Sequence, residues 1–136
     1  MPQGCFADTF YFIALVSKQD EAHRQAVELS KGTSYPLVTT DAVLLELADA
    51  LSSPADRERT AANIRGFWEH PKMKVRVLDR ALLRRALDLY ASRRDKDWGL
   101  TDCISFVVME EEGITEALTG DAHFEQAGFR ILFPRS

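Results

Sequence analysis

The sequence contains few of the residues that hold small secreted or zinc-stabilised proteins together. Only two of its 136 residues are cysteines, Cys5 and Cys103, and both lie in apolar stretches. Neither has the close Cys or His neighbours that structural zinc sites use. We therefore expect two reduced thiols that pack as small core residues, and neither a disulfide framework nor a zinc finger.

Long hydrophobic runs are also missing. The apolar stretch from Phe10 to Val16 is too short to cross a bilayer. No basic segment and no small-residue cleavage site accompany it, so nothing in the sequence marks export. The apolar fraction of 46% and the charged fraction of 28% are typical of a globular protein. We expect one cytoplasmic domain over residues 1–136.

The net charge of −4 is unevenly distributed along the chain. Residues 57–96 contain twelve Lys or Arg and five Asp or Glu, so the acidic excess lies in the rest of the sequence. A basic segment on an acidic body is compatible with nucleic-acid binding. Solvated helix faces or a contact for an acidic partner explain it equally well.

Short apolar stretches alternate with segments of helical periodicity. Strands are expected at residues 4–7, 36–39, 74–78, 116–119 and 130–133. Helices are expected at residues 9–17, 20–31, 41–51, 54–70, 80–92, 102–112 and 121–127. This alternation predicts an α/β fold with a mainly parallel sheet and helices on both faces. Ligands of such folds bind beyond the carboxyl ends of the strands.

Four acidic residues occupy unusual places in this pattern. Asp8 and Asp121 each follow a predicted strand, Asp102 opens an apolar helix, and Glu46 interrupts the apolar stretch DAVLLELADAL. Each has an ordinary alternative explanation. Asp8 and Asp121 could cap helices, Asp102 could sit in the first turn after a Thr101 cap, and Glu46 could lie on the rim of a buried stripe.

If these acids converge, their like charges need a cation between them. Carboxylate oxygens suit Mg²⁺ or Mn²⁺ better than zinc. A divalent ion held in this way is suited to phosphodiester hydrolysis. The sequence offers no glycine-rich phosphate loop and no Ser or Cys nucleophile elbow, and its three histidines are scattered.

The stretches ADTFYFIAL, WGLTDCISFVVM and ALTGDAHFEQAGF, together with Glu46 on the third helix, resemble the PIN-domain family. The similarity covers essentially the whole chain and is greatest to the VapC-type ribonuclease toxins of bacterial toxin–antitoxin pairs. It implies a three-layer α/β/α sandwich with about five strands. It also implies a Mg²⁺ or Mn²⁺ site for RNA cleavage formed by Asp8, Glu46, Asp102 and Asp121.

The resemblance implies several further features. Thr119 matches a small hydroxyl residue near the last acid, where it would hydrogen-bond an acid or a metal-bound water. Asp97 lies where some relatives carry a further acid, and we interpret it as a solvated loop residue. An antitoxin partner and a homodimer are expected. Residues 44–68 could supply the dimer surface, although Phe67 and Trp68 are expected in the core.

The same resemblance gives the basic segment a role. We expect some of its cations to contact RNA phosphates while the acids perform the chemistry. The candidates are Lys72, Lys74, Arg84, Arg85, Arg93, Arg94 and Lys96.

Two alternatives remain open at the level of the sequence. One is a PIN-like module used mainly for binding RNA or protein. The other is a receiver-type signalling domain, which also combines an α/β fold with a Mg²⁺-binding acid cluster. A receiver domain would need adjacent acids after the first strand and a late lysine, whereas Asp8 stands alone and no Lys follows Lys96.

Overall fold

A parallel sheet organises the protein, in a computed structural model that describes residues 4–32 and 36–133. The strands are β1 (Cys5–Ala7), β2 (Leu37–Thr40), β3 (Met73–Arg76), β4 (Glu116–Leu118) and β5 (Arg130–Ile131). They form a five-stranded sheet in the order β3-β2-β1-β4-β5, and neighbouring strands pair in parallel. The predicted parallel sheet is therefore confirmed. Its order differs from the 2-1-3-4-5 order of receiver-type folds, which removes that alternative.

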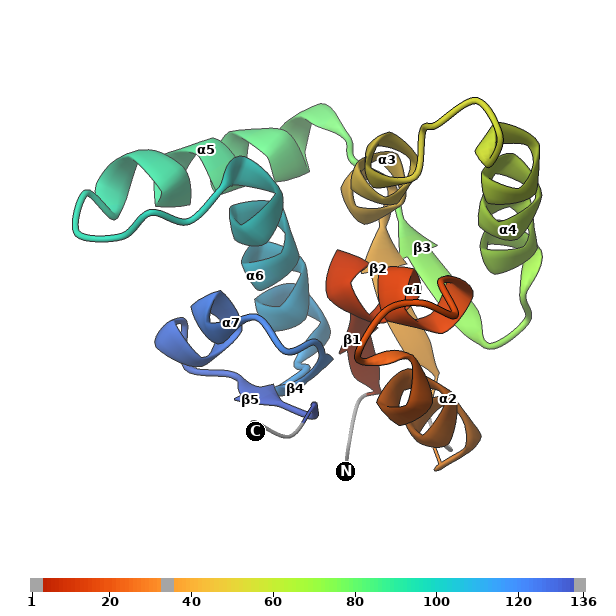
Figure 1. Cartoon of the computed structure of the whole chain (residues 1–136). Helices are drawn as coiled ribbons and strands as arrows, with labels where there is room; N and C mark the ends of the chain where they lie inside the picture. Colours follow the sequence, from red (N-terminus) through yellow and green to blue (C-terminus); the bar gives the residue numbers. More distant parts are fainter. Residues whose placement is uncertain (1–3, 33–35, 134–136) are drawn as a thin grey trace.

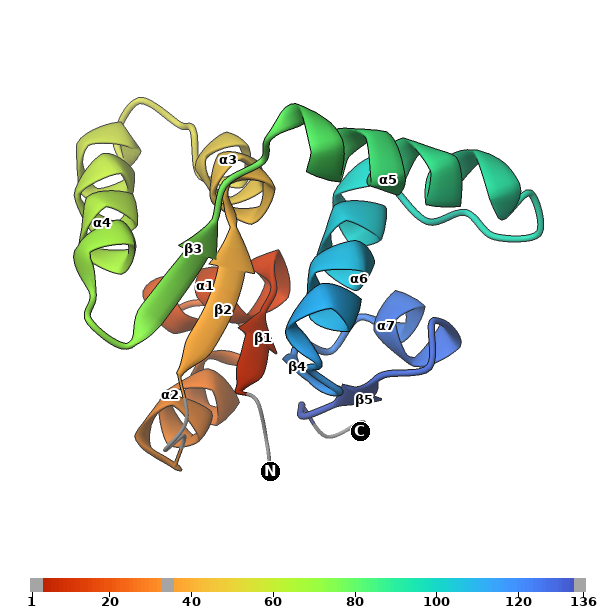
Figure 2. The same cartoon turned by 180° about the vertical axis from the view of Figure 1, so that it is seen from behind.

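Helices cover the sheet on both sides. They are α1 (Thr9–Val16), α2 (His23–Gly32), α3 (Asp41–Ala50), α4 (Arg57–Glu69), α5 (Arg80–Ser92), α6 (Leu100–Glu112) and α7 (Ala122–Gln126). Helices α1 and α2 lie in front of the sheet in Figure 1, and the strands lie in front of them when the molecule is seen from behind in Figure 2. Helix α6 lies on the opposite face with α5 across its first half. The α/β/α layering is as predicted.

Helix α6 is the centre of the hydrophobic core. Its residues from Cys103 to Met109 are all buried, as its nearly continuous apolar sequence requires. The ring of Phe106 packs edge-on against Trp98 and Phe124, with ring centroids 5.0 Å apart in both pairs. Both cysteines are buried free thiols, as expected. Because α6 is clamped in this way, the residues in its first turn have a fixed position.

The start of α6 differs from the prediction. Thr101 is not its cap, because the helix begins at Leu100 with Gly99 as the N-cap. The carboxylate of Asp102 reaches back and accepts a hydrogen bond of 3.0 Å from the Gly99 N–H. This contact satisfies a free backbone donor at the helix start. Asp102 is therefore the third residue of α6 rather than the first.

Of the two α4 aromatic residues expected in the core, one packs inward and the other is exposed. The Phe67 ring packs on Phe12 with a centroid distance of 4.7 Å. Trp68 is 54% exposed, contrary to the expectation. Successive residues of a helix point about 100° apart, so a helix that buries Phe67 turns Trp68 toward solvent. No helix in the described ranges is both long and apolar enough to span a membrane.

Candidate metal centre

Two neighbouring strands bring the first and last predicted acids together. The pairing of β1 with β4 sets Ala7 beside Leu118, so Asp8 and Thr119 leave the sheet side by side. The Thr119 hydroxyl donates a hydrogen bond of 2.8 Å to Oδ2 of Asp8 and accepts one of 3.0 Å from the Asp121 N–H. Thr119 is fully buried. It thus joins the loops that carry both carboxylates, which agrees with its predicted hydrogen bond to an acid.

Gly120 occupies the short connection between these residues. A Cβ atom at this position would lie 2.7 Å from Cζ of Phe10, well inside van der Waals contact. The backbone of Gly120 does not adopt a positive φ. A larger residue here would have to push the Phe10 ring aside, whereas the backbone itself makes no demand for glycine.

Asp8 carries its carboxylate into the protein interior. Its backbone holds the N-cap position of α1, but its side chain makes no capping hydrogen bond. The residue is only 5% exposed. The pKa of Asp8 is raised to about 7, mainly by burial, while the Thr119 hydroxyl lowers it and the charges of Asp102 and Glu46 raise it. A negative charge at this place is costly without a cation nearby.

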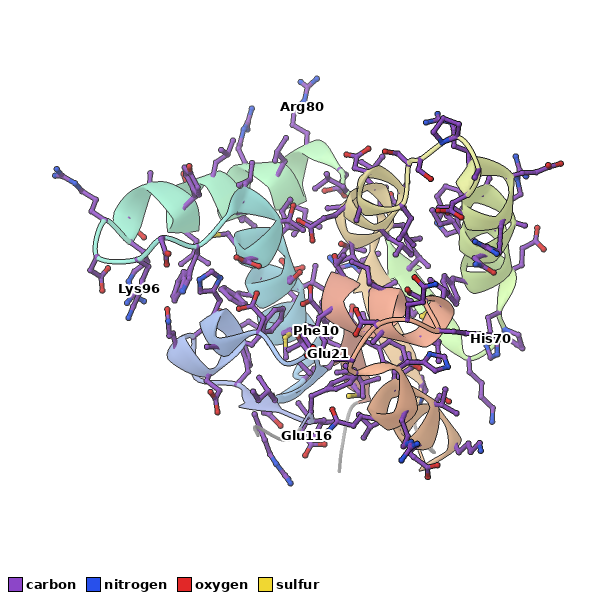
Figure 3. All side chains as sticks on the ribbon, in the orientation of Figure 1. Phe10, Glu21, His70, Arg80, Lys96 and Glu116 are labelled. Atoms are coloured by element: carbon purple, nitrogen blue, oxygen red, sulfur yellow. The ribbon has the colours of Figure 1, made fainter. Side chains whose placement is uncertain are left out.

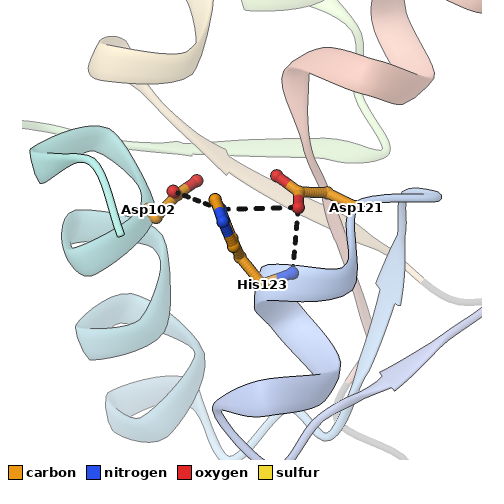
Figure 4. Close-up of side chains that lie close together, drawn as sticks. All are labelled: Asp102, Asp121 and His123. Atoms are coloured by element: carbon orange, nitrogen blue, oxygen red, sulfur yellow. Dashed lines mark hydrogen bonds and ion pairs between the residues drawn. The ribbon is translucent and has the colours of Figure 1, made fainter. Parts of the chain in front are cut away.

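Asp102 and Asp121 face each other across His123 (Figure 4). Oδ1 of Asp121 accepts a hydrogen bond of 2.9 Å from the His123 N–H, so Asp121 does cap α7. The His123 Nδ1 atom lies 3.1 Å from Oδ2 of Asp102 and 3.5 Å from Oδ1 of Asp121. One ligand atom from each of the three residues lies within 4.8 Å of the other two. The first turns of α6 and α7 thus form a compact group of metal-binding side chains.

The charges of this group shift one another's protonation. Burial raises the pKa of Asp102, and the charge of Asp121 adds to the increase. Burial lowers the pKa of His123, but the charges of Asp121, Asp102 and Asp97 outweigh it, so the pKa of the imidazole is raised. Both shifts favour the more positively charged form of the group, as expected of a site that binds a cation.

Glu46 lies on α3 and, like Asp8, stands outside the group of Asp102, Asp121 and His123. Its Oε1 atom accepts a hydrogen bond of 2.5 Å from the hydroxyl of Thr9, the residue after Asp8. Glu46 itself is exposed. This location agrees with the rim of the buried stripe, and the Glu46 carboxylate is near enough for its charge to raise the pKa of Asp8.

His123 is not among the site residues predicted from the sequence. The sequence feature that could have indicated His123 is its position two residues after Asp121, in the first turn of a helix. Asp97 also lies close, because its Oδ1 atom is 3.3 Å from Nε2 of His123. The Asp97 side chain is 89% exposed, as a solvated loop residue should be.

The basic segment is partly neutralised within the protein. Lys74 and Arg76 bind Glu112 at 3.0 and 2.8 Å, and Arg76 also binds Glu111 at 2.7 Å. Arg85 forms an ion pair with Glu111 as well. These contacts tie β3 and α5 to the last turn of α6. The local excess of positive charge is therefore smaller on the surface than in the sequence.

Among the other candidate cations, Arg84 is exposed on α5, and the rest lie in two separate places. Lys72 precedes β3, at the amino edge of the sheet and close to His70 on the right of Figure 3. Lys96 lies at the opposite side of that view, in the loop between α5 and α6. In this loop Arg93 pairs with Asp95 at 2.9 Å and lies over the Trp98 ring. Within the described ranges, no ion pair holds Arg94 or Lys96.

Solved structures of known proteins share this fold. The crystal structure of VapC20 from Mycobacterium tuberculosis, described as a sarcin–ricin loop cleaving toxin, superposes with a TM-score of 0.88 at 25% identity, covering 96% of this chain and 99% of that one. DNA-bound VapBC from Salmonella typhimurium gives a TM-score of 0.67 at 19% identity, covering 97% and 98%. FitAcB from Neisseria gonorrhoeae gives 0.66 at 13% identity, covering 94% and 96%.

The family assignment comes from the sequence comparison. No curated protein sequence matches the chain significantly. The family model described as PIN domain matches residues 5–130, which include the carboxyl edge of the sheet with all four predicted acids. The structural neighbours are toxins of the VapC type, as the sequence motifs suggested. The chain belongs to the PIN-domain family.

Proposed function

We propose that the protein is a divalent-metal-dependent endoribonuclease that acts as the toxin of a toxin–antitoxin pair. The convergence of Asp8, Asp102 and Asp121 at the carboxyl edge of the sheet carries this proposal, with Glu46 joined through Thr9. VapC20, a structural neighbour at 25% identity, is described as a sarcin–ricin loop cleaving toxin. The shared fold, together with the acids that this chain gathers at the carboxyl edge of its sheet, supports the same class of reaction here.

The four acids would hold Mg²⁺ or Mn²⁺. When bound, such an ion would lower the pKa of a water molecule and neutralise the charge that develops on the phosphate. Thr119 holds the Asp8 carboxylate and the Asp121 backbone in place through its single hydroxyl. The fixed first turn of α6 does the same for Asp102. This preorganisation keeps the ligands close despite their repulsion.

Two cations are placed to bind the RNA backbone beside this centre. Arg94 and Lys96 lie in the loop that leads to Asp97, whose carboxylate is next to His123. The loop is anchored by the Trp98 indole, which donates a hydrogen bond of 3.0 Å to Gln126 on α7. Arg94 and Lys96 can therefore hold phosphates without using charges that the fold needs elsewhere.

Protein partners are part of the proposal. Neighbouring folds occur as a toxin–antitoxin complex from Klebsiella pneumoniae and as VapBC complexes, which supports an antitoxin for this chain. A homodimer would cover apolar side chains that the fold leaves exposed on its α3 and α5 sides. These are Leu45, Val77, Leu87 and Tyr90.

RNA cleavage by the purified protein tests the function. The substrate is total RNA that includes ribosomal RNA, with Mg²⁺ or Mn²⁺ and with or without chelator. We expect cleavage that needs the metal and that falls about 100-fold or more in Asp102→Asn. Asp95→Asn is the matched control, because Asp95 lies on the nearby loop and pairs only with Arg93 among the described ion pairs. Equal cleavage by Asp102→Asn would contradict the proposed site.

A further inference from the structure

His123 already has the spacing of a ligand beside two carboxylates. Its Nδ1 atom is 3.1 Å from Oδ2 of Asp102 and 3.5 Å from Oδ1 of Asp121 (Figure 4). Adjacent ligands of an octahedral ion lie about 3.0 Å apart when each metal–ligand distance is about 2.1 Å. The three atoms thus need only small shifts to share one ion.

The two ring nitrogens of His123 face different carboxylates. The His123 N–H donates to Asp121, which places the residue in the first turn of α7. Its side chain is 27% exposed, so the ring is held between α6 and α7 rather than free in solvent. The opposite ring nitrogen, Nε2, is 3.3 Å from Oδ1 of Asp97. A carboxylate on the far nitrogen is the usual companion of a metal-binding imidazole, and it leaves the lone pair on Nδ1 for the ion.

The other two histidines have different surroundings. Nδ1 of His23 lies 2.8 Å from the Ala14 carbonyl oxygen. Nδ1 of His70 accepts a hydrogen bond of 3.0 Å from the Lys72 N–H. His70 lies at the right edge of Figure 3, on the opposite side of the molecule from α7. Both contacts are local backbone contacts. His123 differs because its ring joins three carboxylates from two parts of the chain.

We propose that Nδ1 of His123 is a nitrogen ligand of the ion held by Asp102 and Asp121, and that it makes the centre prefer Mn²⁺ and later first-row ions to Mg²⁺. The inference rests on the proposed metal centre. Mg²⁺ selects oxygen ligands and gives up its waters reluctantly. Imidazole favours the transition metals, whose affinity for nitrogen rises from Mn²⁺ toward Ni²⁺. A carboxylate-only centre would show this preference more weakly.

Electron spin-echo spectroscopy of the Mn²⁺-loaded protein tests the ligand directly. The wild-type protein should show coupling to one directly bound ¹⁴N nucleus. Labelling its histidines with ¹⁵N should change that coupling without any mutation. His123→Asn replaces Nδ1 by an amide oxygen at nearly the same place, so the nitrogen coupling should disappear. His70→Asn is the matched control and should keep it.

Equilibrium binding tests the preference. We expect His123→Asn to weaken Mn²⁺ binding by about tenfold and to change Mg²⁺ binding by less than about threefold. The ratio of the two affinities should stay at its wild-type value in His70→Asn.

Two results would overturn the inference. One is a wild-type protein whose bound Mn²⁺ shows no coupling to a histidine nitrogen, although Mn²⁺ binding requires Asp102. The other is an unchanged ratio of Mn²⁺ to Mg²⁺ affinity in His123→Asn. Neither result bears on RNA cleavage. Absence of RNA cleavage together with a clear Mn²⁺–nitrogen coupling would count against the proposed function alone.

Discussion

At the scale of single residues, the buried carboxyl of Asp8 couples the site to pH. Its pKa is raised by burial to about 7 in the folded protein, above the ordinary value of 3.8. As pH rises through this interval, the unfolded chain releases the proton first. The metal-free folded state therefore loses stability between about pH 4 and pH 7, because the unfolded chain then binds fewer protons than the folded one.

Asp8→Asn tests this coupling. In chelator, we expect the thermal midpoint of the wild-type protein to fall as pH rises from 5 to 8. The variant should show a flatter profile and a higher midpoint at pH 8, because an uncharged amide can still accept the Thr119 hydrogen bond. Its midpoint should also respond less to added Mn²⁺. A variant with the wild-type pH slope would contradict the argument, and Asp95→Asn provides an exposed control.

The residues of the candidate site were predictable to different extents. Asp8 and Asp121 could be located because carboxyl ends of parallel strands meet at one edge. Their roles as metal ligands remain predictions. His123 could not be recognised in this way, since its contact with Asp102 joins positions 21 residues apart and depends on how α7 packs against α6. Periodicity defines the faces of a helix but not the neighbour that each face meets.

At the scale of elements, the last turn of α6 anchors β3 and α5. Glu112 accepts hydrogen bonds from Lys74 and Arg76, and Glu111 pairs with Arg76 and Arg85. Burial raises the pKa of Glu112, but the two cations lower it by more, so its pKa lies below the ordinary value. These contacts hold the basic strand and helix against the most buried element of the fold.

Glu112→Gln should weaken this anchor. We expect a loss of about 1 kcal/mol in the free energy of unfolding at low salt, and a smaller loss at high salt, because the partners are partly exposed. Urea unfolding at two salt concentrations measures both values. Glu110→Gln is the control on the same turn, where the side chain is exposed. An equal loss in the two variants would contradict a specific role for Glu112.

The succession of elements was predictable, while several of their ends were not. The last strand extends only from Arg130 to Ile131, and α4 begins at Arg57 rather than near Pro54. Strand ends depend on the length of the neighbouring strand, which local sequence does not encode. The start of α6 depends on the carboxylate of Asp102 reaching back to Gly99. Such a contact is decided by one rotamer.

At the scale of the whole molecule, some cations form ion pairs within the fold and others remain unpaired on the surface. The sequence predicts that some cations of residues 57–96 contact RNA phosphates, but Lys74, Arg76 and Arg85 are paired with acids of α6. Those acids lie outside the segment, so local charge counting cannot find the pairs. Arg94 and Lys96, which form no ion pair among the described residues, lie on the loop that also carries Asp97, and Asp97 contacts His123. The proposed RNA path therefore passes over this loop.

Salt dependence of RNA binding distinguishes the two groups of cations. Binding of single-stranded RNA in chelator avoids cleavage and can be followed by fluorescence anisotropy at several salt concentrations. Each phosphate contact on a single strand contributes about 0.7 to the slope of log affinity against log salt. We expect Arg94→Gln combined with Lys96→Gln to reduce the slope by about 1.4. Lys74→Gln should leave the slope unchanged, because Lys74 already forms an ion pair with Glu112. A double variant with the wild-type slope, or an equal effect of Lys74→Gln, would move the RNA path away from this loop.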